Sequence, residues 1–136
     1  MPRPPLPPEG DALLRRANPA VIATVRADGS PHTAVTWYDW DGERILVNMD
    51  ASRLRLANIR RDPRVSVTVM DGPNWYRQLT LFGRVDELRD DDGFADINRL
   101  SLRYTRREFR NRSRPRVSAL IAPERWYGWE GSGHWP

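Results

Sequence analysis

Alternating apolar and polar positions divide most of the chain into short strands joined by tight turns. The six segments with this pattern span residues 20–27, 32–40, 44–49, 65–70, 75–87 and 117–121. Asp28-Gly29 and Asp41-Gly42 are hairpin signals, so the first three segments are predicted to form an antiparallel meander. Gly83 interrupts the longest segment and predicts a bulge or bend there.

Three segments have helical spacing instead. They are residues 10–18, residues 52–62, where Ser52 is the expected N-cap and Pro63 the stop, and residues 90–104, which open on three aspartates. Helices inserted between hairpin-connected strands predict the α+β class, with the six strands forming a small antiparallel barrel.

The second helix carries arginines where a helix disfavours them. Arg53 and Arg55 fall in its first turn, where exposed backbone N–H groups are partly positive and each cation costs about 0.3–1 kcal/mol. An anion held between the two guanidiniums would turn this free-energy cost into a gain, so a phosphate site is predicted. Arg60 and Arg61 lie near the C-terminus, where they complement the dipole. Together with the basic, irregular connection expected at 106–116, they are also candidates for contact with a longer anionic ligand.

Composition limits the remaining choices. With 136 residues the chain is expected to form one domain at 10–130, preceded by a proline-rich arm at 1–9 and followed by a tail at 131–136. A net charge of +4, with arginine as the basic residue throughout, favours anionic partners. No apolar run approaches the roughly 20 residues of a membrane span, and a cytoplasmic location is expected.

Side-chain catalysis finds little support in the sequence. There is no cysteine, and neither histidine stands at a metal-ligand spacing, so we expect no metal site. A nucleophile elbow and glycine-rich phosphate loops are missing, and no catalytic side chain is assigned. Tyr38 or Tyr76 could donate a proton, although a structural role is the expected one for either ring. The strand segment 33–38 mixes small, hydroxyl and aromatic residues, which suits either a flat ring against the backbone or an ordinary barrel strand.

Four stretches in this order resemble a known superfamily: AVIATVRADGSPHTAVTWYDWDGERILVNM, SRLRLANIRRDPRVSVTV, LFGRVDEL and PERWYGW. The chain is similar to the pyridoxamine 5′-phosphate oxidase-like split β-barrel superfamily over about residues 10 to 130. Within it, the deazaflavin-dependent oxidoreductases that use coenzyme F-420 are the most similar branch.

The resemblance implies a Greek-key split barrel and a homodimer with two coenzyme sites in clefts between the subunits. It places the coenzyme ring against the second strand and the phosphate at the arginine helix, with FMN as the alternative coenzyme. The implied coenzyme-binding residues are Thr33, Val35, Thr36, Trp37, Ser52, Arg53, Arg55, Arg60, Gln78, Trp126 and Trp129. Many relatives carry lysine at the position of Arg55, so the phosphate here would contact a planar guanidinium rather than a compact ammonium group.

The implied activity is hydride transfer from reduced F-420 to a small organic acceptor. Two alternatives stay open beside it: an FMN-dependent oxidoreductase, and a flavin-binding module without turnover. Arginines interleaved with six tryptophans could also grip nucleic acid, which would give a steep loss of affinity with salt; we do not expect this partner.

Overall fold

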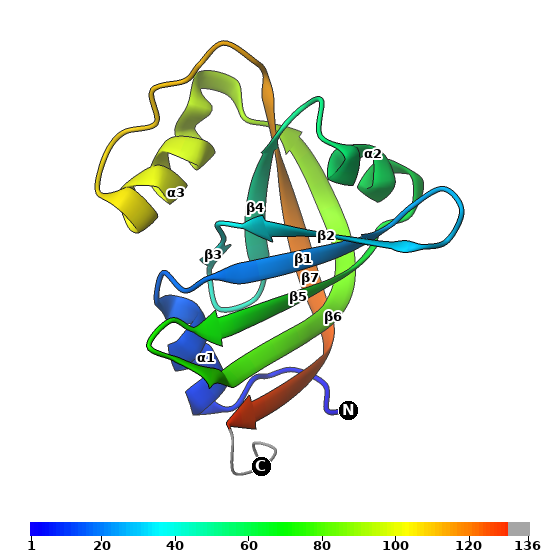
Figure 1. The fold of residues 1–136 in the computed structure, drawn as a ribbon, viewed down its shortest axis with the longest axis vertical. Helices are drawn as coiled ribbons and strands as arrows, with labels where there is room; N and C mark the ends of the chain where they lie inside the picture. The colour runs from blue at the N-terminus through cyan, green and yellow to red at the C-terminus, as the bar shows by residue number, and fades with distance from the viewer. Residues whose placement is uncertain (131–136) are drawn as a thin grey trace.

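The structure is a computed structural model that describes residues 1–130. A single antiparallel sheet in the order β2-β1-β5-β6-β7-β4-β3 forms the molecule's centre (Figure 1). Its strands are β1 (Ala20–Val25), β2 (Pro31–Thr36), β3 (Asp39–Trp40), β4 (Ile45–Asp50), β5 (Arg64–Asp71), β6 (Asn74–Asp90) and β7 (Arg116–Glu130). The helices are α1 (Pro8–Arg15), α2 (Leu54–Arg61) and α3 (Ala95–Thr105), with a short 3₁₀ turn, η1 (Asp92–Phe94), before the last.

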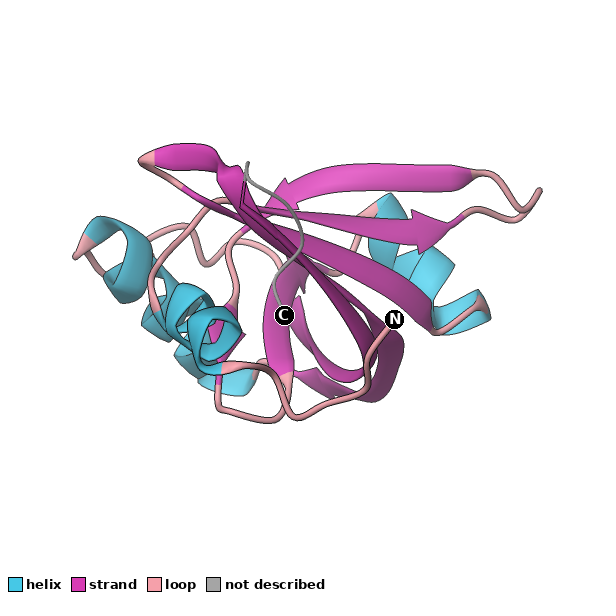
Figure 2. Ribbon diagram, turned by 90° about the horizontal axis from the view of Figure 1, so that it is seen from below, coloured by secondary structure: helices cyan, strands magenta, loops and turns pink. Residues whose placement is uncertain are grey.

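The sheet is strongly curled, and the helices lie around its rim (Figure 2). Helices α2 and α3 lie toward one end of the sheet, and α1 lies toward the other (Figure 1). The predicted α+β class and antiparallel barrel are confirmed. Among residues 1–130, no helix has the length and apolar character needed to cross a membrane.

The strand count differs from the prediction at one place. The expected strand at 32–40 is divided into β2 and β3, because the chain leaves the sheet at Trp37 and Tyr38. Tyr38 turns into the core, where its hydroxyl donates to the carbonyl oxygen of Arg16 at 2.8 Å, and Trp37 stacks on Tyr104 with ring centroids 5.5 Å apart. Both partners lie far away in the sequence, so the alternation of the segment did not reveal the break.

The last strand is longer than predicted, since β7 continues to Glu130 along β6. The register of this pair shifts between Phe82 and Gly83, where the chains approach so closely that a Cβ on Gly83 would collide with the carbonyl oxygen of Ala122. The glycine therefore forms the predicted bulge for a steric reason.

One face of the sheet packs inward and the other faces out. Inward residues such as Ile22, Val67 and Leu81 are fully buried in one core. On the outer face, two neighbouring cross-strand rows on β2, β1, β5 and β6 carry no charged side chain. The first row is Val35, Val21, Thr68 and Thr80, and the second is Thr33, Ala23, Ser66 and Phe82. We call these eight residues the uncharged face.

Candidate functional site

Two adjoining pockets lie where β2, α2 and the start of β7 meet. Their volumes are about 230 and 380 Å³, and they share Val35, Arg55 and Arg116. The first is also lined by Thr36, Trp37, Asn48, Ile97, Leu100 and Phe109, and the second by His32, Ala34, Arg53 and Leu54. We call the pair of pockets the arginine cleft.

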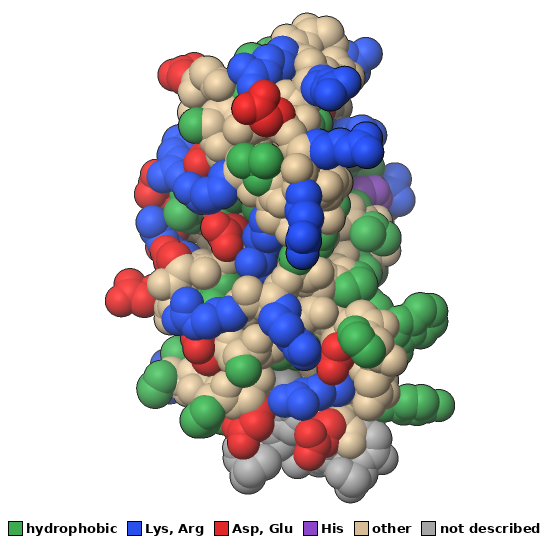
Figure 3. Space-filling model, turned by 90° about the vertical axis from the view of Figure 1, so that its left-hand side faces the viewer, with side chains coloured by type: hydrophobic (Ala, Val, Ile, Leu, Met, Phe, Trp, Pro, Cys, Tyr) green, Lys and Arg blue, Asp and Glu red, His purple; other side chains and the backbone are tan. Residues whose placement is uncertain are grey.

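The absence of carboxylates distinguishes the cleft from the rest of the surface. Arginines are dispersed over the face that carries α1 and α3, but acidic side chains lie among them (Figure 3). Arg44, for example, lies 3.0 Å from Asp86, and Arg89 lies 3.2 Å from Asp96. None of the residues that line the cleft is acidic. Asp50 and Asp91, outside the lining, attract the charge of Arg116, but no carboxylate offsets the charge of Arg55.

The turn before α2 places two arginines at the cleft, although not in the way predicted. Ser52 is not the N-cap: its backbone N–H and hydroxyl both donate to Asp50, at 2.8 and 2.7 Å, and this local turn delays the helix. Arg53 is the N-cap residue, no side chain caps the first turn, and that turn contains no acidic residue. The helix therefore begins at Leu54 with its positive pole uncompensated.

Arg55 has the least favourable electrostatic environment in the cleft. Burial lowers its pKa, and the nearby charges of Arg53 and Arg116 lower the pKa further. One terminal nitrogen donates to the carbonyl oxygen of Asn48 at 3.2 Å, whereas the buried Nε has no hydrogen-bond partner in the described part of the chain. A buried donor without an acceptor is costly, and an anionic oxygen in the cleft would supply both the acceptor and the missing charge.

Two residues have a more specific place in this arrangement than the sequence predicted. Arg116, the first residue of β7, was expected as one arginine of a basic connection that suits a longer anion; in the structure its Nε donates to Asn48 Oδ1 at 2.7 Å. His32 lines the same pocket as Arg53, and its buried Nδ1 has no partner among residues 1–130. Arg116 and His32 reach the cleft through the pairing of strands that are distant in sequence. The only local signal in the sequence was the series of basic residues before Val117.

The other half of the cleft is flatter and less polar. Val35 is 78% exposed at its mouth, and Ile97 and Leu100 form an apolar wall. Thr36 is buried, and its hydroxyl donates to the carbonyl oxygen of Trp37 at 2.8 Å. Val35 is therefore the accessible residue at this end of β2, and the half-buried Trp37 follows directly after the strand. This geometry suits a planar ring against the strand edge.

The predicted site residues do not all meet there. The cleft unites Val35, Thr36, Trp37, Arg53 and Arg55. Thr33 lies on the uncharged face. Ser52 is engaged by Asp50, and Arg60 is exposed in the last turn of α2. Gln78 and Trp129 are cross-strand neighbours near the far ends of β6 and β7.

Trp126 does not close a cleft with its side chain. It is 5% exposed within the core of its own chain, and its indole nitrogen donates to the carbonyl oxygen of Arg3 at 3.3 Å. The backbone N–H of Trp126 also donates to the carbonyl oxygen of Pro2, at 3.0 Å. The indole therefore anchors the N-terminal residues, which corrects its expected role. The predicted tail at 131–136 lies outside the described residues.

A proton-donor role for Tyr38 also finds no support. Its ring is fully buried and its hydroxyl is engaged by a backbone carbonyl. Burial strongly raises the pKa of Tyr38. Tyr76 is 72% exposed near the β5–β6 turn and does not line the cleft.

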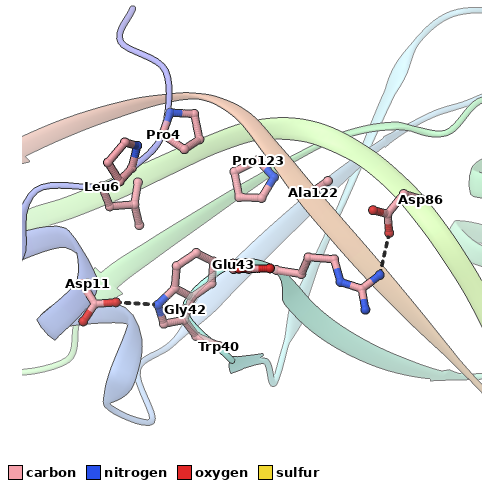
Figure 4. Close-up of a pocket in the computed structure, with 11 residues that line it drawn as sticks. Pro4, Leu6, Asp11, Trp40, Gly42, Glu43, Asp86, Ala122 and Pro123 are labelled. Carbon is pink, nitrogen blue, oxygen red and sulfur yellow. Dashed lines mark hydrogen bonds and ion pairs between the residues drawn. The ribbon is translucent and has the colours of Figure 1, made fainter.

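A larger pocket of about 680 Å³ lies between Leu6, Trp40 and Pro123, away from the arginine cleft (Figure 4). Its polar groups are already engaged, since the Trp40 indole donates to Asp11 at 2.9 Å and Arg44 pairs with Asp86. With three carboxylates and one paired arginine in its lining, this pocket repels anions. It is therefore a poor candidate for a phosphorylated coenzyme.

An antiparallel, curled sheet with a cationic cleft defines the class of small α+β barrels, and comparison with known proteins identifies the family. A family model described as pyridoxamine 5′-phosphate oxidase matches residues 6–130. The chain belongs to the pyridoxamine 5′-phosphate oxidase family, and its fold is that family's split β-barrel.

Three solved structures illustrate the relationship. A protein described as an F420 reductase is 30% identical, with a TM-score of 0.83, and the match covers 89% of this chain and 98% of that one. The conserved hypothetical protein Rv2991 of Mycobacterium tuberculosis is 24% identical, with a TM-score of 0.70 and coverages of 94% and 86%. A putative pyridoxamine 5′-phosphate oxidase of Listeria innocua is 21% identical, with a TM-score of 0.65 and coverages of 88% and 96%.

Proposed function

We propose that the protein is an oxidoreductase that binds coenzyme F-420 in the arginine cleft and uses it to reduce a small organic acceptor. The single observation that carries this proposal is the environment of Arg55. A half-buried guanidinium whose Nε lacks a hydrogen-bond partner among residues 1–130, next to two like charges and no carboxylate, supports the assignment of an anion-binding site.

The residues fit a phosphorylated ring coenzyme in both halves of the cleft. Arg53 and Arg55 would hold the phosphate, assisted by the uncapped first turn of α2. Val35 and Trp37 would face the ring. F-420 is favoured over FMN because the relative at 30% identity is described as an F420 reductase, and because a protein of net charge +4 suits the additional carboxylates of F-420.

A homodimer with the coenzyme sites at its interface is part of this proposal. The uncharged face occupies two cross-strand rows on the outer side of four strands and ends at the Arg64–Arg84 pair; depletion of charge is the compositional mark of an interface centre. Val35 belongs both to this face and to the cleft. A second subunit packed on the face would therefore close the mouth of the cleft, and Gln78, which we keep as a coenzyme contact, would then act from the partner.

When bound, the coenzyme supplies the hydride chemistry. The chain's own residues supply binding, orientation and exclusion of water. Arg53 and Arg55 fix one end of the ligand, and the wall formed by Ile97 and Leu100 keeps the ring half dry. No side chain of the cleft is assigned an acid or base role.

The test is a fluorescence titration of purified protein with F-420 and, separately, with FMN. Saturable F-420 binding, followed by oxidation of the reduced coenzyme in the presence of an enone, quinone or tetrapyrrole acceptor, is the expected result. Submicromolar FMN binding without an F-420 response would contradict the choice of coenzyme. Tight binding of reduced F-420 with no acceptor oxidised would favour a module without turnover.

Two further expectations remain predictions. One is the division into an arm at 1–9, a coenzyme-binding domain at 10–130 and a tail at 131–136. The other is the cytoplasmic location. Limited proteolysis and cell fractionation test them, respectively.

A further inference from the structure

We infer that Arg116 is a third anion-binding guanidinium of the arginine cleft, and that Asn48 is the residue that positions it. The inference rests on the proposed function and extends it to a defined contact for Arg116, which the sequence placed only in a basic connection suited to a longer anion, and to Asn48, which the sequence gave no role.

Arg116 is already oriented for a ligand. Its Nε donates to Asn48 Oδ1 at 2.7 Å, and its guanidinium lies 5.0 Å from the centre of the Phe109 ring. One edge and one face of the group are thereby fixed, and its terminal nitrogens form no hydrogen bond within residues 1–130; the charges of Asp50 and Asp91 act on it from outside the cleft lining. An arginine held in this way loses little conformational entropy when it binds an anion.

The position of Arg116 is as informative as its orientation. It lines both pockets of the cleft, together with Val35 and Arg55. Its charge therefore acts where the polar half and the ring half meet. A ligand with its phosphate in one half of the cleft and its ring in the other would therefore lie beside this guanidinium.

Asn48 can serve only in the orientation observed. Its amide nitrogen donates to Asp91 Oδ2 at 3.0 Å and to Ser118 Oγ at 2.9 Å. A carboxylate accepts but does not donate, so the nitrogen must face Asp91 and the oxygen must face Arg116. The Asn48 backbone carbonyl also accepts from Arg55, so this one residue, 4% exposed, holds two arginines of the cleft.

The same network reaches the cleft wall. Both carboxylate oxygens of Asp91 accept backbone N–H groups of the first turn of α3, those of Asp96 and Ile97, each at 2.9 Å. Ile97 itself lines the ring half of the cleft. Asn48 thus connects the arginines to the helix that forms the apolar wall.

The test is a double-mutant cycle on F-420 affinity at physiological salt. Arg116→Ala is expected to weaken binding about 10- to 100-fold, the loss of one charge-assisted contact. Arg110→Ala is the matched control, because it removes one positive charge from an exposed side chain of the same connection that does not line the cleft; its effect is expected to be below about twofold. Asn48→Ala should weaken binding about tenfold in the parent and have almost no further effect in the Arg116→Ala background.

Equal effects of Asn48→Ala in both backgrounds would show a merely structural role and overturn the positioning claim. Because the loss of Asn48 also removes one hydrogen bond each from Asp91 and Ser118, Phe109→Leu provides a second cycle that keeps an apolar side chain under the guanidinium. Normal binding by Arg116→Ala, with binding lost in the Arg53→Ala/Arg55→Ala variant, would overturn this inference alone. A parent protein that binds neither F-420 nor FMN would overturn the proposed function as well.

Discussion

Replacing both Arg53 and Arg55 by alanine should abolish coenzyme binding without unfolding the protein. Each guanidinium is expected to make at least one charge-assisted hydrogen bond to the anion, about 1.5–3 kcal/mol apiece. Loss of both therefore raises the dissociation constant roughly 10²- to 10⁴-fold.

The effect on folding should be small because opposing changes offset each other. Removing two cations from the positive pole of α2 stabilises the apo protein by about 0.3–1 kcal/mol each. Losing the bond from Arg55 to the Asn48 carbonyl costs about 1 kcal/mol. No cap is lost, since the Arg53 side chain does not cap the helix. The free energy of unfolding should stay within about 1 kcal/mol of the parent's.

The assay pairs urea denaturation of the apo protein with fluorescence titration of the coenzyme. Arg15→Ala/Arg84→Ala is the control, because it removes the same net charge from two exposed, ion-paired residues that do not line the cleft. The control should bind like the parent. A folded Arg53→Ala/Arg55→Ala variant that binds like the parent would refute the electrostatic reasoning. An equal loss of coenzyme affinity in the control would show that net charge, and not the position of the two arginines, determines binding.

Three further predictions concern the fold and the assembly. Gly83→Ala should destabilise the protein by about 1–3 kcal/mol in urea denaturation, because the new Cβ meets the Ala122 carbonyl; unchanged stability would disprove the tight bulge. Burial raises the pKa of Tyr104 to about 12, so the stability from this group is complete below pH 10 and is lost as the pH rises toward 12. Tyrosinate absorbance should therefore follow alkaline unfolding in the parent, and Tyr104→Phe should lose less stability across that interval. Thr68→Arg, at the centre of the uncharged face, should give a folded monomer in analytical ultracentrifugation and weaken coenzyme binding; a persistent dimer would move the interface elsewhere.

The strands were predictable because alternation is a local signal. The alternation of apolar and polar positions around Ile22 and Val67 is sufficient to assign both residues to the inner face, and both are buried. The break between β2 and β3 was not predictable, since Tyr38 finds its partner in the carbonyl of Arg16, whose approach depends on the complete fold.

The candidate site shows the same division between local and distant signals. The placement of Arg53 and Arg55 in one helix start followed from adjacent residues, although Asp50 rather than Ser52 controls the turn. The basic connection that ends at Arg116 was visible in the sequence, but its contact with the cleft was not, because its partner Asn48 is 68 positions away. The roles of residues that would act across a subunit interface likewise depend on contacts that no single-chain pattern encodes.

The central claim is that the anion belongs between the arginines of the cleft, and a crystal structure of the protein with F-420 tests it most directly. The account predicts the phosphate within hydrogen-bonding distance of Arg53 and Arg55, with the ring beside Val35 and Trp37. A ligand bound instead in the pocket beside Trp40, with the arginine cleft empty, would contradict it.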